Sequence, residues 1–332
     1  MSTLGLVILV AVALAFDFTN GFHDAANAVA TSIATRALRP VTALGTAAGL
    51  NVIGALVSTK VATTVGNGII GTPHGSAALT IVFAALAGAI FWNLFTWRLG
   101  LPSSSTHALI GGLVGAAIGS AGTVKWDGLL SKVVVPMAIS PLIGFGLGYL
   151  TVIVILWLFR RFRPDPVNRG FRHAQFLSTA AMSYSHGTQD AQKTMGVITL
   201  ALLASGHLSR FHVPVWVILA AAATMGVGTV AGGWRIIRTL GSRITPLDPP
   251  RGFAAQASAS AVLLVSAYGY ALPVSSTHVI TSSVMGAGAT RRLRAVRWGV
   301  AREVVLAWVL TIPGAGASAW IVYLILHGLL RL

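Results

Sequence analysis

The sequence contains no cysteine and very little acid. Only 9% of its 332 residues are charged, and seven of them are Asp or Glu. The absence of cysteine excludes a disulfide framework and a thiolate metal site. The low charge excludes an ordinary soluble domain, in which roughly a quarter of the residues are charged. Because 55% of the residues are hydrophobic, the chain is expected to lie in a membrane.

Long apolar runs rich in Ala, Gly, Leu and Val take the place of the missing charges. Such runs favour helices over a barrel, which would show short alternating segments. The length allows about ten to twelve crossings, since each needs about 20 apolar residues. We therefore predict an all-α polytopic protein of the cell inner (plasma) membrane. Residues 1–16 lack a basic start and run directly into Asp17, so we expect a retained first helix and not a signal peptide.

The net charge of +16 comes from arginines grouped in breaks between the apolar runs. These breaks are residues 160–172, 235–251 and 291–302. Grouping of this kind is typical of cytoplasmic loops in membrane proteins and needs no nucleic-acid partner. We predict that all three loops face the cytoplasm.

Two motifs occur twice, in the same order. LPSSSTH at 101–107 returns as LPVSSTH at 272–278, and NGFHDAAN at 20–27 is echoed by HGTQDAQK at 186–193. A duplicated unit in a carrier places the substrate where the two copies meet. We predict an inverted-repeat carrier with a first transmembrane repeat at 1–159, a basic cytoplasmic linker at 160–173 and a second repeat at 174–332.

Each Ser-rich motif is followed by an apolar run that is too short to cross a bilayer. Residues 108–119 would extend about 18 Å as a helix, against a hydrocarbon core of about 30 Å, and residues 279–289 are no longer. We predict two re-entrant helical hairpins with the Ser-rich motifs at their tips. Irregular backbone at that depth must face protein or a water-filled cavity.

The hairpin tips are suited to binding an oxyanion. Their hydroxyls lie beside the free N–H groups at a helix start, where the dipole favours negative charge. Capping of the helix or contact with a neighbouring helix is the alternative role for any single hydroxyl. The candidate ligands of a tetrahedral oxyanion are Ser103, Ser104, Ser105, Thr106, Ser275, Ser276 and Thr277.

The second motif supplies the acids expected within membrane helices, where an ionisable group is costly and usually functional. Helical spacing places Asn20, Asp24 and Asn27 on one face of a helix, and it does the same for His186, Asp190 and Lys193. These two sets form two polar stripes. Asn27 of the first stripe corresponds to Lys193 of the second. We therefore hypothesise that the ammonium stands where a cation would otherwise bind, which favours proton coupling. The candidate coupling residues are Asn20, His23, Asp24, Asn27, His186, Gln189, Asp190 and Lys193, with His107 and His278 as candidate proton relays.

These four motifs together resemble the PiT family of inorganic phosphate transporters, in its bacterial branch, over essentially the whole chain. The resemblance implies an inverted-repeat carrier, a homodimer, phosphate between the two hairpins and coupling cations at the Asp motifs. It also implies low-affinity import by proton symport, with divalent metal–phosphate complexes as substrates and no permanently bound cofactor. The chain departs from the Asn-Asp-x-x-Asn pattern of sodium-coupled members at His23 and Lys193.

Other functions remain open on the sequence. They are a sulfate permease of the same family, a sodium-coupled phosphate symporter, an anion channel and, from another class, an intramembrane Ser-His hydrolase. Carboxylates near the anion favour phosphate, because hydrogen phosphate can donate to them while sulfate is repelled. Duplication and the lack of a Gly-x-Ser-x-Gly elbow disfavour the hydrolase.

Overall fold

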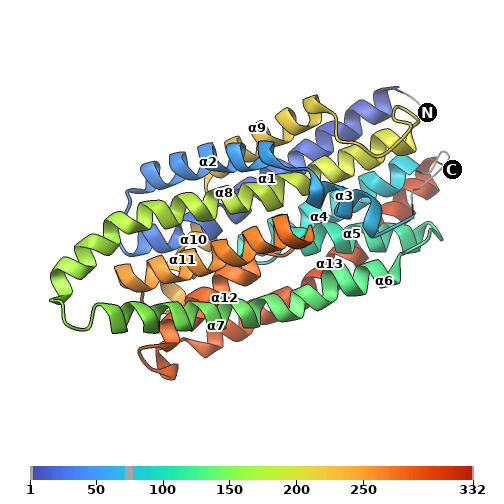
Figure 1. The fold of residues 1–332 in the computed structure, drawn as a ribbon. Coiled ribbons are helices and arrows are strands. Elements are labelled where there is room, and N and C mark those ends of the chain that lie inside the picture. The colour runs from blue at the N-terminus through green and yellow to red at the C-terminus, as the bar shows by residue number, and fades with distance from the viewer. Residues whose placement is uncertain (1–2, 72–77, 331–332) are drawn as a thin grey trace.

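The structure, a computed structural model, describes residues 3–71 and 78–330. Helices account for nearly all of them, and within these ranges the only β feature is one isolated bridge between Ile70 and Val124. The all-α prediction is confirmed. Figure 1 shows the helices running roughly along one long axis, as membrane helices do.

The helices of the first half of the chain precede the basic linker (Figure 1). They are α1 (Thr3–Ala34), α2 (Pro40–Val57), α3 (Lys60–Gly68), α4 (Ala78–Leu99), α5 (Ser105–Gly119), α6 (Trp126–Leu129), η1 (Leu130–Val134) and α7 (Val135–Leu158).

The second half begins with the longest helix of the described chain. Its elements are α8 (Pro164–Ala204), α9 (Val215–Ala231), α10 (Trp234–Arg238), η2 (Thr239–Arg243), α11 (Pro249–Leu264), η3 (Val265–Gly269), α12 (Ser276–Ala289), η4 (Leu293–Ala295) and α13 (Trp298–Leu330).

Six helices of the described ranges are long and apolar enough to cross a membrane, or seven if α9 and the segment Trp234–Arg243, bent by 60°, form one span. This is fewer than the ten to twelve crossings expected from length. The difference has two causes: α5 and α12 have only 15 and 14 residues, and α8, with 41 residues, carries the polar His186–Lys193 stripe. The membrane class is confirmed, whereas the re-entrant placement and the inverted repeat stay predictions.

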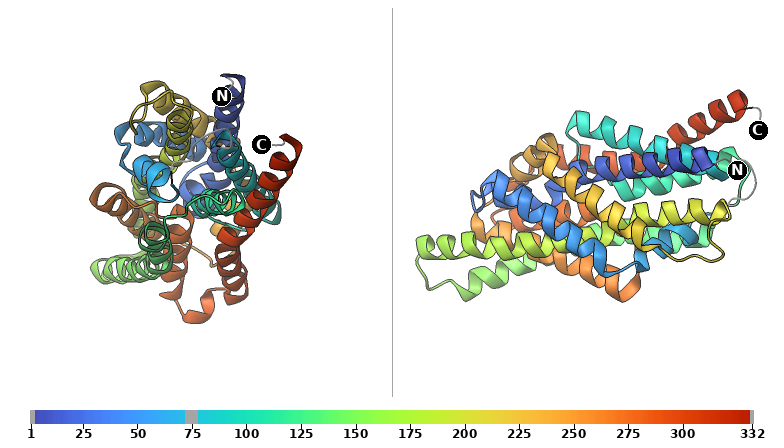
Figure 2. Two further views of the ribbon diagram at one scale, coloured as in Figure 1. Left: turned by 90° about the vertical axis from the view of Figure 1, so that its right-hand side faces the viewer. Right: turned by 90° about the horizontal axis from the view of Figure 1, so that it is seen from above.

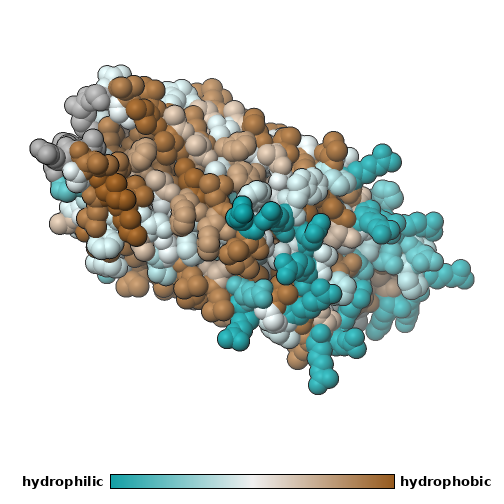
Figure 3. Space-filling view, turned by 180° about the vertical axis from the view of Figure 1, so that it is seen from behind, coloured by the Kyte–Doolittle hydropathy of each residue, from teal (hydrophilic) through white to brown (hydrophobic). Residues whose placement is uncertain are grey.

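The outer surface is that of a membrane protein. Large apolar side chains are exposed along α7 and α13, such as Leu142 (73%) and Val309 (59%). Figure 3 shows apolar surface over most of one face and hydrophilic side chains gathered at one end. That end contains the α7–α8 connection and lies opposite both termini (Figures 1 and 2). Its charge is that expected of a cytoplasmic face.

Two helix pairs, α4 with α5 and α11 with α12, form similar hairpins in the two halves (Figure 1). In each, a residue with left-handed backbone ends the incoming helix: Gly100 (φ 69°) in the first and Ala271 (φ 52°) in the second. Both positions directly precede a Leu-Pro pair, so the repeat extends to the backbone. The chain then runs without helix through 101–104 and 272–275 before α5 and α12 begin.

Glycines of the acid motifs let neighbouring helices approach closely. A Cβ on Gly21 in α1 would lie 2.7 Å from the Met225 carbonyl of α9, and one on Gly187 in α8 would overlap the Asn51 carbonyl of α2. Small residues at such crossings bring backbones together, which is how membrane helices gain packing energy. The acid motifs are therefore held rigidly by α9 and α2.

Candidate functional site

The two hairpin tips are built alike and meet inside the molecule. The Ser104 hydroxyl accepts from the His107 N–H at 3.2 Å and caps α5, and Ser275 caps α12 through His278 in the same way, also at 3.2 Å. The rings of His107 and His278 lie 4.8 Å apart. Two helix N-termini therefore converge, and the capping hydroxyls keep their own hydrogens free to donate to an anion.

Asp24 of α1 joins the two tips. One carboxylate oxygen accepts from the Ser105 hydroxyl at 2.6 Å, and the other accepts from Thr277 at 3.4 Å and from His23 Nδ1 at 2.7 Å. Asn20, one turn earlier, also accepts from Ser105. The acid thus lies among the hydroxyls that were predicted to bind the anion.

Asp190 of α8 occupies the corresponding place in the second half. It lies 3.0 Å from Lys193 Nζ and 3.1 Å from His186 Nε2, and it accepts from the Ser276 hydroxyl at 3.4 Å. The Asn51 amide of α2 contacts the other His186 nitrogen at 3.3 Å. The second acid is therefore paired with a fixed cation, which the first acid lacks.

Contacts cross from one half of the chain to the other. The Asn27 amide donates to Thr277 at 2.9 Å and to Ser276 at 3.3 Å, and Lys193 Nζ donates to Ser105 at 3.5 Å. Each polar stripe therefore touches the tip of the opposite half. The site is a single network, as expected if the substrate binds where the copies meet.

His23 links the network to the wall of the first hairpin. Its Nε2 lies 3.2 Å from the Thr96 hydroxyl of α4 and 3.4 Å from the Ser103 hydroxyl, and those hydroxyls are 2.7 Å apart. Because Thr96 donates to the Trp92 carbonyl at 2.8 Å, Ser103 donates to Thr96 and neither hydroxyl hydrogen is left for the ring. His23 Nε2 is therefore the donor in these contacts, while its Nδ1 lies against Asp24 at 2.7 Å.

Four predicted site residues make no side-chain hydrogen bond to this network in the described structure: Gln189, His107, His278 and Thr106. Gln189 donates to the Leu263 carbonyl of α11 at 3.2 Å. The His278 ring stacks on Trp308 with 4.1 Å between ring centroids and meets His107 edge-to-face at 4.8 Å, so the two histidines pack together. The relay role of His107 and His278 and the ligand role of Thr106, which is buried at the tip, stay predictions.

Sequence reasoning missed Asp17, Asn51 and Thr96 as members of the site. Asp17 is fully buried in α1, accepts from Thr194 at 2.8 Å and has one oxygen without a partner among the described residues. Its burial in a charge-poor helix was the available signal, since an acid within a membrane span is rarely idle. Asn51 and Thr96 gave no signal, because single polar residues in apolar helices have many structural roles.

The whole site is closed to solvent, with Asp24 at 2%, Asp190 at 0% and Lys193 at 1% exposure. Oxygen and nitrogen atoms of Asp24, His186 and Asp190 lie within 4.8 Å of one another, a spacing that could hold a metal ion. Lys193 competes for the same Asp190 carboxylate.

Comparison with known proteins gives a consistent result. A sequence profile described as "Phosphate transporter family" matches residues 20–319. A protein named "Probable low-affinity inorganic phosphate transporter" from Rhizobium meliloti (strain 1021) is 48% identical over 322 residues, covering 96% of this chain and 95% of its own.

Similarly named proteins occur in other bacteria. The Mycobacterium bovis protein is 49% identical over 327 residues, covering 97% of this chain and 78% of its own, and the Bacillus subtilis (strain 168) protein is 42% identical over 324 residues, covering 97% of each. A solved structure, "The sodium-dependent phosphate transporter", matches with a TM-score of 0.85 over 98% of this chain and 99% of its own at 24% identity, which shows the fold. The PiT resemblance is thus confirmed: the chain belongs to the phosphate transporter family.

Proposed function

We propose that the protein imports inorganic phosphate by proton symport. Family membership supports transport of phosphate and disposes of the hydrolase alternative. The observation that carries proton coupling is the position of Asp24, which is hydrogen-bonded to His23 at 2.7 Å and to the tip hydroxyl of Ser105 at 2.6 Å. The His23–Asp24 pair, which contains two groups able to take up a proton, thus engages a hydroxyl donor that the substrate needs.

An ionised Asp24 would oppose phosphate in two ways. It would accept the hydrogens of Ser105 and Thr277, and it would repel a second negative charge. Two like charges 4 Å apart repel by about 4 kcal/mol at an effective dielectric constant of 20. A proton on the His23–Asp24 pair removes that repulsion and frees the hydroxyls for the anion. Proton binding and phosphate binding then favour each other.

The fixed charge of Lys193 supports the same proposal from the second half. Its ammonium lies 3.0 Å from Asp190 and 3.5 Å from Ser105, so one positive charge is always present beside the tip. A mobile sodium ion is not needed there. The only charge that must arrive from solution is the proton at the first acid.

The test is uptake of labelled phosphate into vesicles that contain the purified protein. An inward pH gradient should drive accumulation, whereas an inward sodium gradient should not. Replacing Asp24→Asn keeps an oxygen that can accept from Ser105 but removes titration, so we expect at least a tenfold loss of pH-driven uptake. Exchange of internal for external phosphate should continue, because it needs no net proton movement.

Asp127→Asn is the matched control, since Asp127 is exposed in α6 and should leave both activities unchanged. Full pH-driven uptake by the Asp24→Asn variant would contradict proton coupling through this acid. Sulfate is added as competitor in the same assay. Full competition by sulfate would contradict phosphate as the preferred substrate and support the sulfate permease.

A second candidate is transport of a divalent metal–phosphate complex. The observation in its favour is the close approach of ligand atoms from Asp24, His186 and Asp190, since carboxylate and imidazole together suit such ions. Vesicles offered radioactive manganese and phosphate should then take up both in a fixed ratio. Equal phosphate uptake with and without the metal would contradict this candidate and leave free phosphate as the substrate.

A further inference from the structure

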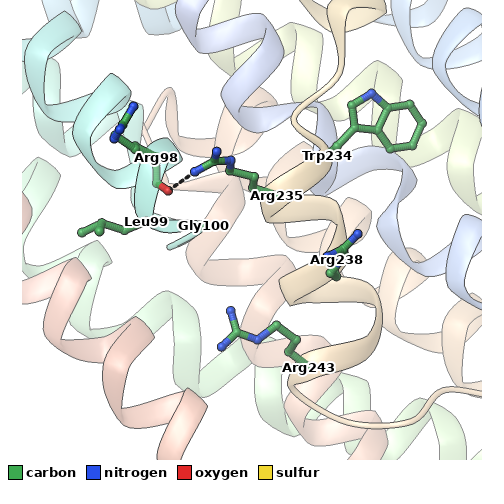
Figure 4. A pocket seen from close by; sticks show the side chains of 7 residues that line it. All are labelled: Arg98, Leu99, Gly100, Trp234, Arg235, Arg238 and Arg243. Carbon is green, nitrogen blue, oxygen red and sulfur yellow. Dashed lines mark hydrogen bonds between the residues drawn. The ribbon is translucent and has the colours of Figure 1, made fainter.

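A second basic site lies outside the network described above. The end of α4 and the bent segment α10–η2 enclose a cavity of about 410 Å³ (Figure 4). Four of its seven lining residues are arginines, and the others include one aromatic side chain and one glycine. The lining residues are Arg98, Leu99, Gly100, Trp234, Arg235, Arg238 and Arg243.

The positive charge of this arginine pocket is not neutralised by the protein. Acids of the described chain that form ion pairs do so with other residues, and no ion pair involves Arg98, Arg238 or Arg243. All three side chains are exposed at the pocket. Like-charged guanidinium groups that line one cavity repel one another, so their arrangement is stabilised when an anion binds among them.

Arg235 is held by contacts within the protein, whereas the side chains of Arg98, Arg238 and Arg243 are exposed. Its guanidinium donates to the Arg98 carbonyl at 2.5 Å (Figure 4). It also lies 5.4 Å from the centre of the Trp97 ring. These two contacts hold one side of the pocket rigid. A preformed donor of this kind lowers the entropy cost of binding a ligand.

The pocket is attached directly to the first hairpin tip. Thr239 of η2 donates to the Gly100 carbonyl at 2.8 Å, and Gly100 is three residues from Ser103. Arg98 and Gly100 therefore supply both the pocket wall and the backbone that leads into the tip. An occupant of the pocket would contact the segment that leads into the first tip.

We propose that the arginine pocket binds an anionic phosphate group. The guanidinium fork matches the oxygens of a phosphate, and the pocket opens where the chain carries its other basic loops. Two sources share this chemistry: the headgroup of an anionic lipid, and free phosphate leaving or approaching the first tip. Orientation signals alone require arginines on one side of the membrane, but they do not require four of them around one cavity beside the tip.

The test compares two double variants. One combines Arg238→Gln and Arg243→Gln in the pocket, and the other combines Arg169→Gln and Arg172→Gln outside it. Both pairs remove two exposed charges from the same end, and the second pair lies on α8 away from the pocket. A third protein with Arg238→Lys and Arg243→Lys keeps the charge and shows whether loss follows from charge or from misfolding. Arg98 and Arg235 are left intact because their backbone contact supports the tip.

Two measurements separate the sources. Uptake is measured in neutral phosphatidylcholine vesicles with and without phosphatidylglycerol. Binding of radioactive inorganic phosphate to the purified protein is measured in neutral detergent. Because the chain has no cysteine, a single Arg161→Cys substitution reports orientation, so that phosphate can be offered to the basic face alone.

If a lipid headgroup binds, phosphatidylglycerol should raise wild-type uptake several-fold, and only the Arg238/Arg243 glutamine pair should lose the response. If free phosphate binds, that pair should weaken phosphate binding in detergent at least about tenfold, because two charge-assisted hydrogen bonds are lost. In vesicles of known orientation it should slow the uptake of phosphate offered at the basic face only. In either case the lysine pair, which keeps the charge but lacks the guanidinium fork, should lie between wild type and the glutamine pair, and the Arg169/Arg172 pair should behave like wild type. Equal behaviour of the Arg238/Arg243 glutamine pair and wild type in both measurements would overturn the proposal. The binding measurement needs no proton gradient, so it stands whether or not proton symport is correct.

Discussion

Lys193 holds a fixed positive charge where its counterpart Asn27 presents a neutral amide. Asn27 donates to the Ser276 and Thr277 hydroxyls of the second tip. Lys193 instead pairs with Asp190 at 3.0 Å and donates to Ser105 of the first tip at 3.5 Å. The ammonium is 1% exposed, and a buried charge of this kind is stable only when it is paired. We propose that this buried lysine supplies the positive charge that a bound cation would otherwise supply.

Replacing Lys193→Asn should therefore create a need for an external cation. Asp190 would lose its partner, and the new amide would match Asn27 in offering an oxygen ligand. We expect phosphate uptake to fall at least tenfold in sodium-free buffer and to recover in part when sodium is added. Initial rates in vesicles, measured with sodium or with choline, give the comparison.

Lys193→Met is the matched control, since it removes the charge without supplying a ligand. It should be inactive in both buffers. Rescue of the Met variant by sodium, or equal activity of the Asn variant in both buffers, would show that Lys193 does not occupy a cation position.

The residues of the site were predictable where they repeat and obscure where they do not. Ser105, Ser276 and Thr277 stood out because the same hydroxyl motif occurs twice, and the structure places Ser105 and Thr277 against Asp24 and Ser276 against Asp190. Asn51 holds His186 from a helix with no counterpart motif. Sequence spacing reports neighbours along one helix, but contacts between helices depend on packing that no local pattern encodes.

At the scale of elements, the start of α11 shows how the basic end is held together. Asp248 caps the helix by accepting from the Arg251 N–H at 3.1 Å, and it pairs with Arg251 and, at 2.8 Å, with Arg291 from the α12–α13 connection. Partial burial alone would raise the pKa of Asp248, but hydrogen bonds from Arg291 and the charge of Arg251 outweigh it. The net result is a pKa below the usual value for aspartate.

The lowered pKa makes this contribution to stability dependent on pH. A group with a lower pKa in the folded state stabilises the fold above its unfolded pKa of about 3.9, and the contribution is lost as pH falls through the folded value. Asp248→Ala should cost about 1 kcal/mol at neutral pH through loss of the cap. Asp248→Asn should cost less because asparagine also caps. Denaturant unfolding in detergent, at neutral pH and below pH 4, measures both.

Asp165→Asn serves as the control, because Asp165 is exposed at the start of α8 and has no ion pair within the described ranges. An Asp248→Ala cost that stayed constant down to the lowest pH would rule out a contribution from the charge.

Secondary-structure elements were predicted well where the length of an apolar run determines the helix, and less well where polar residues interrupt that run. The Ser-rich tips and the short helices after them are present as expected, in α5 and α12. Six or seven helices of the described ranges are apolar enough to be recognised as spans, fewer than the length suggests. One reason is α8, whose 41 residues include a buried polar centre. The left-handed backbone at Ala271 was not foreseeable either, since alanine gives no signal for it.

The whole molecule is closed around the site, which bears on whether it is a carrier or a channel. Both tips are buried where they meet, with Ser105 at 0% and Thr277 at 1% exposure. A carrier opens this region to one face at a time, whereas a channel connects both faces at once. The homodimer and the division of the chain into repeats at 1–159 and 174–332 stay predictions, and neither is needed for this distinction.

The absence of cysteine allows a direct test of alternating access. Val274 lies at the second tip with 4% exposure, opposite Ser103 in the repeat and outside the predicted anion ligands. Val274→Cys is close in volume and should fold, because substitutions that conserve volume cost little. A membrane-impermeant thiol reagent should label it slowly at rest. With phosphate and a pH gradient, labelling should rise several-fold from one face and fall from the other.

Adding Asp24→Asn to Val274→Cys should abolish the change caused by the pH gradient, because the gradient then has no acid on which to act. The effect of phosphate alone should remain, since the tip hydroxyls that bind it are intact. Equally fast labelling from both faces at the same moment would contradict a carrier and favour an anion channel. That outcome would also remove the need for the buried acids, because a pore conducts down a gradient without taking up protons at Asp24.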